Sequence, residues 1–451
     1  MIRIANGQGF WGDSIDAPVR LVKEGPLDYL TLDYLAEVTM SIMQKLKRRD
    51  PEGRSGYATD FVDLIRRILP DLLEKNVRVV ANAGGVNPGA CVKAVCAVAR
   101  DAGARGLKVG MVLGDDILDR LDEILAEGVS LANMDDGRPL SEVRDRVLAA
   151  NVYMSAFPIA GALDLGASIV VTGRGTDPGL VVGPLAHEFK WGRDDWNHLA
   201  AATVAGHIIE CGAQCTGGNF SRWWEVSGWD HLGYPVVEAE PDGSFTITKH
   251  DDTGGLVTVD TVSEQLVYEM GNPASYITPD VVADFTSIRL EQAGKDRVAV
   301  TGVTGRPATD TCKVSISYLA GYSAVGQLTV SGPNALEKAK VAASALWGRL
   351  KRAGLTFEET HTEFVGAGAC HGRIGRGSAA PVEVVMRVGV KDADQKKVDR
   401  FGKEIAPLVT SGPPGITGFA GGRPRATEVI AFWPALIPKG LVRADVRVEE
   451  V

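Results

Sequence analysis

Residues 77–89 read VRVVANAGGVNPG, and this stretch decides the class of fold. A short apolar run leads into a glycine turn, and Pro88 suits the first turn of the helix that should follow. Comparable apolar runs lie at residues 2–5, 29–32, 107–112, 152–155 and 169–171, with helical patterns such as residues 60–76 between them. This alternation predicts an α/β fold with a largely parallel sheet and glycine-rich strand-to-helix loops.

The pattern changes near residue 225. Thr/Val-rich runs then alternate at residues 245–250, 256–261, 281–290 and 297–303, which predicts antiparallel strands. A long helix is expected over residues 334–352. We therefore expect three parts: an α/β domain over residues 1–225, a β-rich insertion or lobe over 226–330, and a mixed α+β portion over 331–451 that packs on the first.

Composition narrows the class of protein. The 451 residues carry a net charge of −9, with 45% hydrophobic and 23% charged residues. An acidic chain without basic blocks argues against a nucleic-acid partner. The opening residues lack a signal-peptide pattern, and apolar runs are too short to span a membrane. Six dispersed cysteines fit reduced thiols, so we expect a cytoplasmic protein that does not bind membranes.

The first loop, residues 7–13, reads GQGFWGD and matches the GxGxxG pattern of dinucleotide folds. Asp33 ends the next strand, where such folds place a ribose-binding acid. The bulky Phe10 and Trp11 and the negative charge of Asp13 argue against bound pyrophosphate. The loop could be a tight turn with Asp13 as helix N-cap, or Asp13 could face a pocket beside Gly9 as an acid or base.

Two further loops could bind an anion. Backbone N–H groups of residues 82–89 suit phosphate or carboxylate, or else form a structural turn in which Asn87 caps the helix. In residues 172–177, an arginine could clamp an anion or pair with the nearby aspartate. Two later glycine-rich segments, 366–377 and 412–422, could close over a substrate or be ordinary connections. The substrate-binding candidates in the two earlier loops are Asn82, Gly84, Gly85, Asn87, Arg174, Thr176 and Asp177.

The fourth loop follows an alanine-rich helix and spans residues 207–219. If Glu210 is buried at the helix end, its pKa rises and it can act as general acid or base; neighbouring donors could instead simply satisfy it. Cys211 is a candidate nucleophile and Asn219 a candidate for substrate binding. Cys211 and Cys215 lack a second ligand pair at zinc spacing, so we expect no metal site.

These loops and residues 28–39 (DYLTLDYLAEVT) resemble segments of the acyclic terpene utilisation protein A family, and they occur in the same order along the chain. The resemblance spans residues 1–435. It implies a role in the breakdown of branched acids, close to acyl-CoA chemistry. Longer members carry an additional C-terminal domain, which implies a separate small subunit as a partner here.

The leading hypothesis is an acid–base enzyme, a hydratase, dehydratase or related lyase. Its small-molecule substrate would be an unsaturated or hydroxy carboxylic acid or the corresponding CoA thioester, without a cofactor. One alternative is a non-catalytic subunit that binds an acyl-CoA or organises a complex. Another is an NAD-dependent oxidoreductase. A homo-oligomer is the expected assembly.

Overall fold

The computed structural model describes residues 1–374, 380–418 and 422–451, so parts of both later glycine-rich segments lie outside it. The chain forms two compact units. Unit 1 comprises Met1–Ser317 and Phe432–Val451, and unit 2 comprises Tyr318–Ala431. These units differ from the expected boundaries at 225 and 330. The reason is that strands within residues 235–301 extend the sheet of the N-terminal region and do not form a separate lobe.

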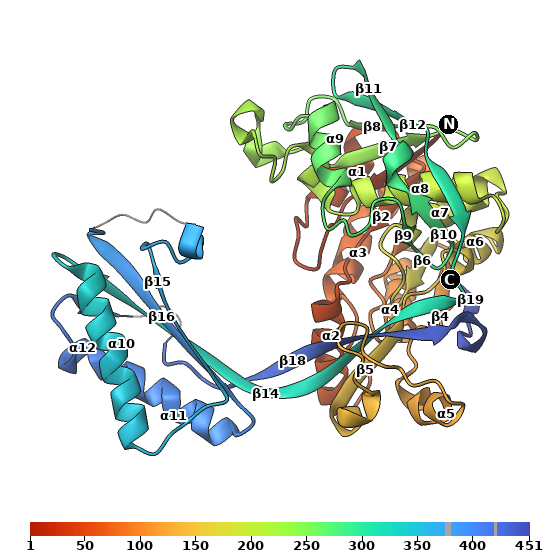
Figure 1. The fold of residues 1–451 in the computed structure, drawn as a ribbon. Helices are drawn as coiled ribbons and strands as arrows, with labels where there is room; N and C mark the ends of the chain where they lie inside the picture. Colours follow the sequence, from red (N-terminus) through yellow and green to blue (C-terminus); the bar gives the residue numbers. More distant parts are fainter. Residues whose placement is uncertain (375–379, 419–421) are drawn as a thin grey trace. The chain divides into compact units, whose positions relative to one another are not determined.

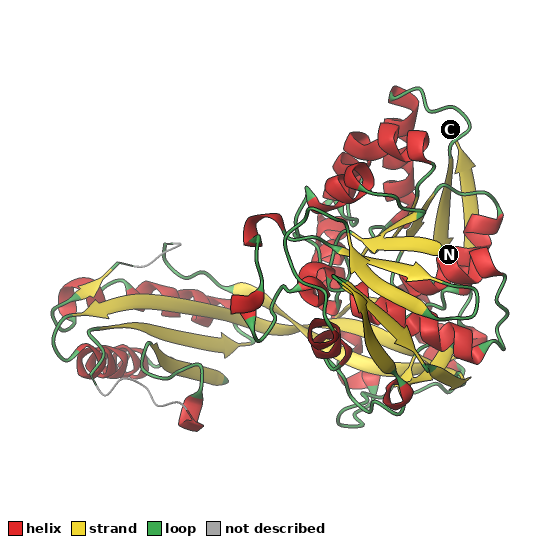
Figure 2. Ribbon diagram, turned by 90° about the horizontal axis from the view of Figure 1, so that it is seen from above, coloured by secondary structure: helices red, strands yellow, loops and turns green. Residues whose placement is uncertain are grey.

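Unit 1 is built on a ten-stranded sheet, shown in Figures 1 and 2. Its five central strands are parallel and follow the order β1 (Ile2–Asn6), β2 (Tyr29–Leu32), β3 (Arg78–Ala81), β6 (Ile169–Thr172) and β4 (Lys108–Leu113). Antiparallel strands flank them: β7 (Pro235–Ala239), β8 (Phe245–Lys249), β12 (Arg297–Thr301) and β11 (Arg289–Gly294) beside β1, and β19 (Asp445–Glu450) beside β4. The expectation of an α/β fold with a largely parallel central region is confirmed.

Helices cover both faces of the central sheet. Val79 of β3 belongs to one buried core and Val80 to another, so successive residues of the strand face opposite sides. The first core includes residues of α1 (Ala17–Glu24), α2 (Glu37–Arg49), α3 (Thr59–Lys75) and α4 (Pro88–Asp101). The second includes residues of α6 (Phe157–Asp164), α7 (Gly179–Phe189), α8 (Trp196–Ile209) and α9 (Val259–Leu266). Burial on both faces explains why the parallel strands are continuous apolar runs.

The order of the parallel strands reverses once. From β3 the chain passes through α4, on one face of the sheet, to β4, and leaves a gap of one strand between β3 and β4. Strand β6 later fills this gap, and the helix before it, α6, lies on the opposite face. Right-handed crossovers place the helix on the other face when the direction of travel reverses. The carboxyl ends of β3, β6 and β4 therefore surround the crevice where open α/β sheets bind ligands.

Three local expectations were wrong. Residues 256–261, expected as a strand, contain the start of α9, because the Thr258 side chain accepts a hydrogen bond from the Thr261 N–H and caps the helix. Residues 281–290 break after β10 (Val281–Asp284), which pairs with β9 (Tyr276–Ile277) and β13 (Thr304–Pro307) in a small sheet. Strand β5 (Val147–Val152) ends where the run at 152–155 was expected to begin, and α5 spans Leu121–Ala126.

Unit 2 has a βαββαβ order of elements, typical of ferredoxin-like domains. The strands lie in the order β15-β16-β14-β17, and the apolar faces of α10 and α11 pack on one side of the sheet. The elements are β14 (Thr311–Ser331), α10 (Ala335–Arg352), β15 (Glu359–Val365), β16 (Glu383–Asp392), α11 (Gln395–Ile405), α12 (Leu408–Ser411) and β17 (Ile416–Thr417); β18 (Thr427–Pro438) also pairs with β14. The first residues of β14, 311–317, and the last of β18, 432–438, belong to unit 1. Within the described ranges, every helix is too short or too polar to cross a lipid bilayer.

Candidate functional site

Polar side chains are buried along the carboxyl edge of the parallel strands. They are Asn6 at the end of β1, Asp33 after β2, Asn82 after β3, Thr172 at the end of β6 and Asp115 after β4. Each is at most 5% exposed. Burial of polar groups costs free energy unless partners satisfy them. A row of five such groups, three of them at the topological switch point, therefore marks a candidate site.

Asp33 and Asn82 are joined directly. The Asn82 Nδ2 group donates to Asp33 Oδ1 at 2.6 Å, and Asn82 Oδ1 accepts from the Tyr34 N–H at 2.7 Å. Burial raises the pKa of Asp33 well above its ordinary value, and the nearby charge of Asp177 adds to the effect. Asn82 therefore positions Asp33, and Asp33 holds its proton more tightly than an exposed aspartate does.

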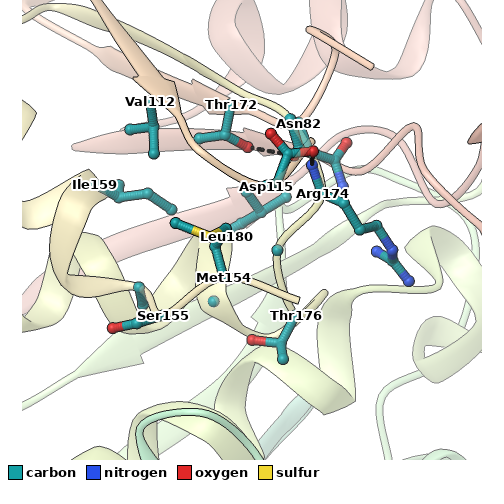
Figure 3. Close-up of a pocket in the computed structure, with 14 residues that line it drawn as sticks. Asn82, Val112, Asp115, Met154, Ser155, Ile159, Thr172, Arg174, Thr176 and Leu180 are labelled. Carbon is teal, nitrogen blue, oxygen red and sulfur yellow. Dashed lines mark hydrogen bonds between the residues drawn. The ribbon is translucent and has the colours of Figure 1, made fainter. Parts of the chain in front are cut away.

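Asp115 was not predicted from the sequence. It accepts hydrogen bonds from the Arg174 backbone N–H at 2.8 Å and from Asn151 Nδ2 at 2.9 Å. Burial raises its pKa to about 6. Asp115 lines a cavity of about 20 Å³ with Asn82, Thr172 and Thr176, which is about the room that one water molecule needs (Figure 3).

Arg174 pairs with Asp177, as the second reading of its loop expected. Its side chain extends away from Asp115 (Figure 3), forms the ion pair, and stacks over the Tyr153 ring at 4.3 Å. Arg174 is 2% exposed, and its Nε atom has no hydrogen-bond partner among the described residues. The guanidinium thus keeps one buried donor after its contacts within the chain are made.

Glu210 and His207 form a buried acid–base pair at the carboxyl end of α8. His207 Nδ1 lies 3.0 Å from Glu210 Oε1, and the two side chains are 2% and 14% exposed. Within the part of the chain that the structure describes, His207 Nε2 and Glu210 Oε2 lack hydrogen-bond partners. Glu210 is therefore buried, as its candidate role requires, and only partly satisfied.

The pKa values of both members of the pair are raised. Burial raises the pKa of Glu210 to about 7 against the opposing influence of His207, and the charge of Asp177 raises it further. Burial lowers the pKa of His207, but the charge and hydrogen bond of Glu210 outweigh it, so the net direction is upward. Both protonation states of Glu210 are accordingly accessible at physiological pH.

A larger pocket of about 460 Å³ lies beside these groups. Thr176 lines both this pocket and the small cavity, and Asp177 lines the pocket wall. Tyr276, another lining residue, packs its ring against His207 with centroids 5.4 Å apart. A molecule in this pocket is thus separated from the His207–Glu210 pair by one aromatic ring and by Asp177.

The first loop has a structural role. Asp13 accepts hydrogen bonds from the backbone N–H groups of Gly9 at 2.9 Å and Ser14 at 2.7 Å, and from the Tyr234 hydroxyl at 2.7 Å. Helix α1 begins only at Ala17, so Asp13 is not its N-cap. A carboxylate with three donors is held in place by the loop, and we do not retain Asp13 as an acid or base.

Gly9 and Cys211 touch each other. A Cβ atom on Gly9 would lie 2.8 Å from the Cys211 carbonyl carbon, so glycine lets the first loop approach the fourth. Burial raises the pKa of the Cys211 thiol to about 12. A thiol that is protonated at neutral pH is a poor nucleophile, so the nucleophilic role of Cys211 loses its support.

Three other predicted binding residues also have contacts within the fold, and a fourth is exposed. The Gly84 N–H donates to the Thr172 carbonyl at 3.0 Å and so joins the second loop to the third. Gly85, with φ of +52°, packs against Met43. Asn87 caps α4 by accepting from the Ala90 N–H at 3.3 Å. Asn219 is exposed. We do not retain Gly85, Asn87 and Asn219 as substrate ligands.

The described residues contain no group of three or more His, Cys, Asp or Glu side chains suited to a metal ion.

The chain matches the family model of the acyclic terpene utilisation family protein AtuA over residues 2–448. It belongs to this family. The AtuA match covers both units, which confirms the resemblance seen in the sequence. No curated protein and no solved structure matches the chain.

Proposed function

We propose that this AtuA family member is an acid–base enzyme, a hydratase, dehydratase or related lyase. Its substrate would be an unsaturated or hydroxy carboxylic acid or the CoA thioester of one, in the breakdown of branched acids. The observation that carries the proposal is the buried Glu210–His207 pair beside a pocket of about 460 Å³. We place the enzyme in the cytoplasm as a homo-oligomer, with a separate small subunit as a candidate partner.

The pair suits a reaction that both gives and takes a proton. A group works best as general acid or base when its pKa lies near the working pH, and the pKa of Glu210 is raised to about 7. Hydration of a conjugated acid needs a base to take one proton from water as its oxygen bonds to the β carbon. The double-bond electrons move onto the carbonyl group, and the α carbon then accepts a proton. Dehydration is the same sequence in reverse.

Charge develops on the carbonyl oxygen during this step, and preorganised donors stabilise it. Among the described residues, Arg174 keeps an unpaired Nε donor but lines the small cavity and not the pocket, so it contributes its positive charge beside the site. Asp33 and Asp115 carry raised pKa values and are additional groups able to hold a proton near the site. Glu210 is our candidate for the proton transfer at carbon, with His207 as the group that exchanges the proton with it. Because the Tyr276 ring lies between the pair and the pocket, this transfer requires the ring to turn away or one water molecule to relay the proton.

Two alternatives receive less support. The Gly9 N–H binds Asp13, and Asp33 is buried against Asn82, so the groups expected at pyrophosphate and ribose are already used. These contacts weigh against an NAD-dependent oxidoreductase. Buried carboxyl groups destabilise a fold, and a subunit that only binds an acyl group has no use for a row of them. Their presence therefore favours an enzyme over a non-catalytic subunit.

The test is turnover of matched compounds in D₂O. The purified protein is incubated with 2-enoic acids, 3-hydroxy acids and their CoA thioesters, and proton NMR follows water addition and exchange of the α hydrogen. Glu210→Gln should lower the turnover rate by about a hundredfold or more, because the general acid–base step is removed. Glu291→Gln, on the exposed strand β11, is the control. Full activity of Glu210→Gln would remove this residue from the mechanism, and no turnover of any compound would favour the non-catalytic alternative.

A further inference from the structure

The pocket of about 460 Å³ has one basic side chain. Lys313, on β14, is the single lysine or arginine among the described residues that line it. Several other walls are apolar, formed by Met134, Pro178, Ile277, Pro279, Cys312 and Leu436. Asp177 also lines the pocket, but its carboxylate is paired with Arg174. A ligand that matches this lining therefore has one anionic group and a hydrocarbon chain.

Aromatic rings hold the Lys313 ammonium in position. Its Nζ atom lies 4.9 Å from the centre of the Tyr153 ring and 5.3 Å from that of Phe432. The Arg174 guanidinium stacks over the same Tyr153 ring. A cation fixed by rings loses less conformational freedom when it binds an anion, so Lys313 is preorganised.

Lys313 also keeps capacity for a ligand. Its only ion pair among the described contacts is with Glu37, at 3.6 Å, beyond ordinary hydrogen-bond length. The Glu37 carboxylate already accepts a hydrogen bond from the Tyr153 hydroxyl. The ammonium has three donors, so a bound carboxylate can take one directly while Glu37 stays in place.

We propose that the pocket binds a free monocarboxylate with an apolar chain, anchored by Lys313, in preference to a CoA thioester. This inference rests on the proposed function and selects between its two substrate forms. A CoA group adds a diphosphate and a further phosphate, which proteins bind with clusters of arginine, lysine and backbone donors. One lysine balanced by Glu37 offers a site for a single carboxylate, and a thioester has no carboxylate to present there.

The test is equilibrium binding, which needs no turnover. Isothermal titration calorimetry compares a panel of C4–C10 monocarboxylates with the corresponding CoA thioesters and with neutral amides; trans-2-hexenoate, trans-2-hexenoyl-CoA and trans-2-hexenamide form one matched set. We expect the acid to bind more tightly than both the thioester and the amide. Tighter binding of the thioester, or no binding of any acid, would overturn the inference.

Lys313→Met keeps the length of the side chain and removes its charge. It should weaken binding of the acid by about tenfold to a hundredfold, the range for loss of a charge-assisted hydrogen bond. Lys313→Arg should restore most of the affinity, and the amide, whose neutral carbonyl accepts a weaker hydrogen bond, should lose less affinity than the acid in Lys313→Met. Equal loss of acid and amide affinity would mean that the substitution damages the pocket, and unchanged acid affinity would remove Lys313 as the anchor. Binding of the acid without conversion would contradict only the proposed reaction.

Discussion

Replacement of Glu210 by glutamine should change how stability depends on pH. Burial raises the pKa of Glu210 from 4.5 to about 7, so the folded protein holds this proton more tightly than the unfolded chain. Stabilisation by the bound proton is complete below pH 4.5 and is lost as pH rises through about 7. His207, whose pKa is also raised, acts in the same direction. Glutamine cannot titrate, so the variant should lack this decline.

The size of the effect follows from the same values. Each tenfold difference in proton affinity between the two states corresponds to about 1.4 kcal/mol, so a pKa raised from 4.5 to about 7 corresponds to about 3 kcal/mol. About 2 kcal/mol of this should appear between pH 5.5 and pH 8.5. Relative to the wild type, Glu210→Gln should therefore gain about 2 kcal/mol in free energy of unfolding over this interval.

Urea unfolding followed by tryptophan fluorescence measures this difference. Trp347 is the single tryptophan in residues 318–431, so a Trp347→Phe background restricts the signal to unit 1. The exposed Glu291→Gln substitution is the matched control and should leave the pH dependence as in the wild type. Parallel pH profiles for the wild type and Glu210→Gln would refute the reasoning, because they would mean that Glu210 binds its proton equally well in both states.

Three further substitutions test individual contacts. Cys211→Ser should keep at least a third of the turnover rate, because a thiol with a pKa of about 12 is not a nucleophile at neutral pH; a loss of about a hundredfold would restore Cys211 to the mechanism. Gly9→Ala should lower the free energy of unfolding of unit 1 by about 1–3 kcal/mol, because the added methyl group clashes with Cys211. Gly271→Ala, which has open space around it, is the control and should leave this free energy unchanged; urea titration measures both. Asp177→Asn should cost on the order of 3 kcal/mol by leaving the buried Arg174 without its carboxylate, and an unchanged melting temperature would contradict that.

The central parallel strands could be predicted because their signals are local. Residues 77–89 contain an apolar run buried on both faces, a glycine turn and a helix start with Asn87 as cap, and each of these is encoded within a few residues. The pairing of β7 with β1 joins residues more than two hundred positions apart. No local pattern specifies that contact, and for this reason β7, β8, β11 and β12 were not predicted to extend the sheet.

Part of the candidate site was also predictable. Glu210 was singled out because it ends an apolar helix, and it is indeed buried beside His207. Asp115 was missed, although it follows the predicted strand at 107–112, because an acidic residue after a glycine resembles an exposed turn. Lys313 was missed because it lies within a strand, where a single charged residue usually faces solvent. Sequence could place the loops at one edge of the sheet, but the partners of each side chain depend on the three-dimensional packing.

The most direct test of the account is the pKa of Glu210 itself. Carbon-13 NMR of protein labelled at the glutamate carboxyl groups gives this value, with Glu210→Gln used to assign the signal. We predict an apparent pKa near 7 and a shift of the same signal in His207→Gln, since the two residues titrate together. A pKa near 4.5 would contradict the account, because Glu210 would then be fully ionised at neutral pH and could not supply the proton.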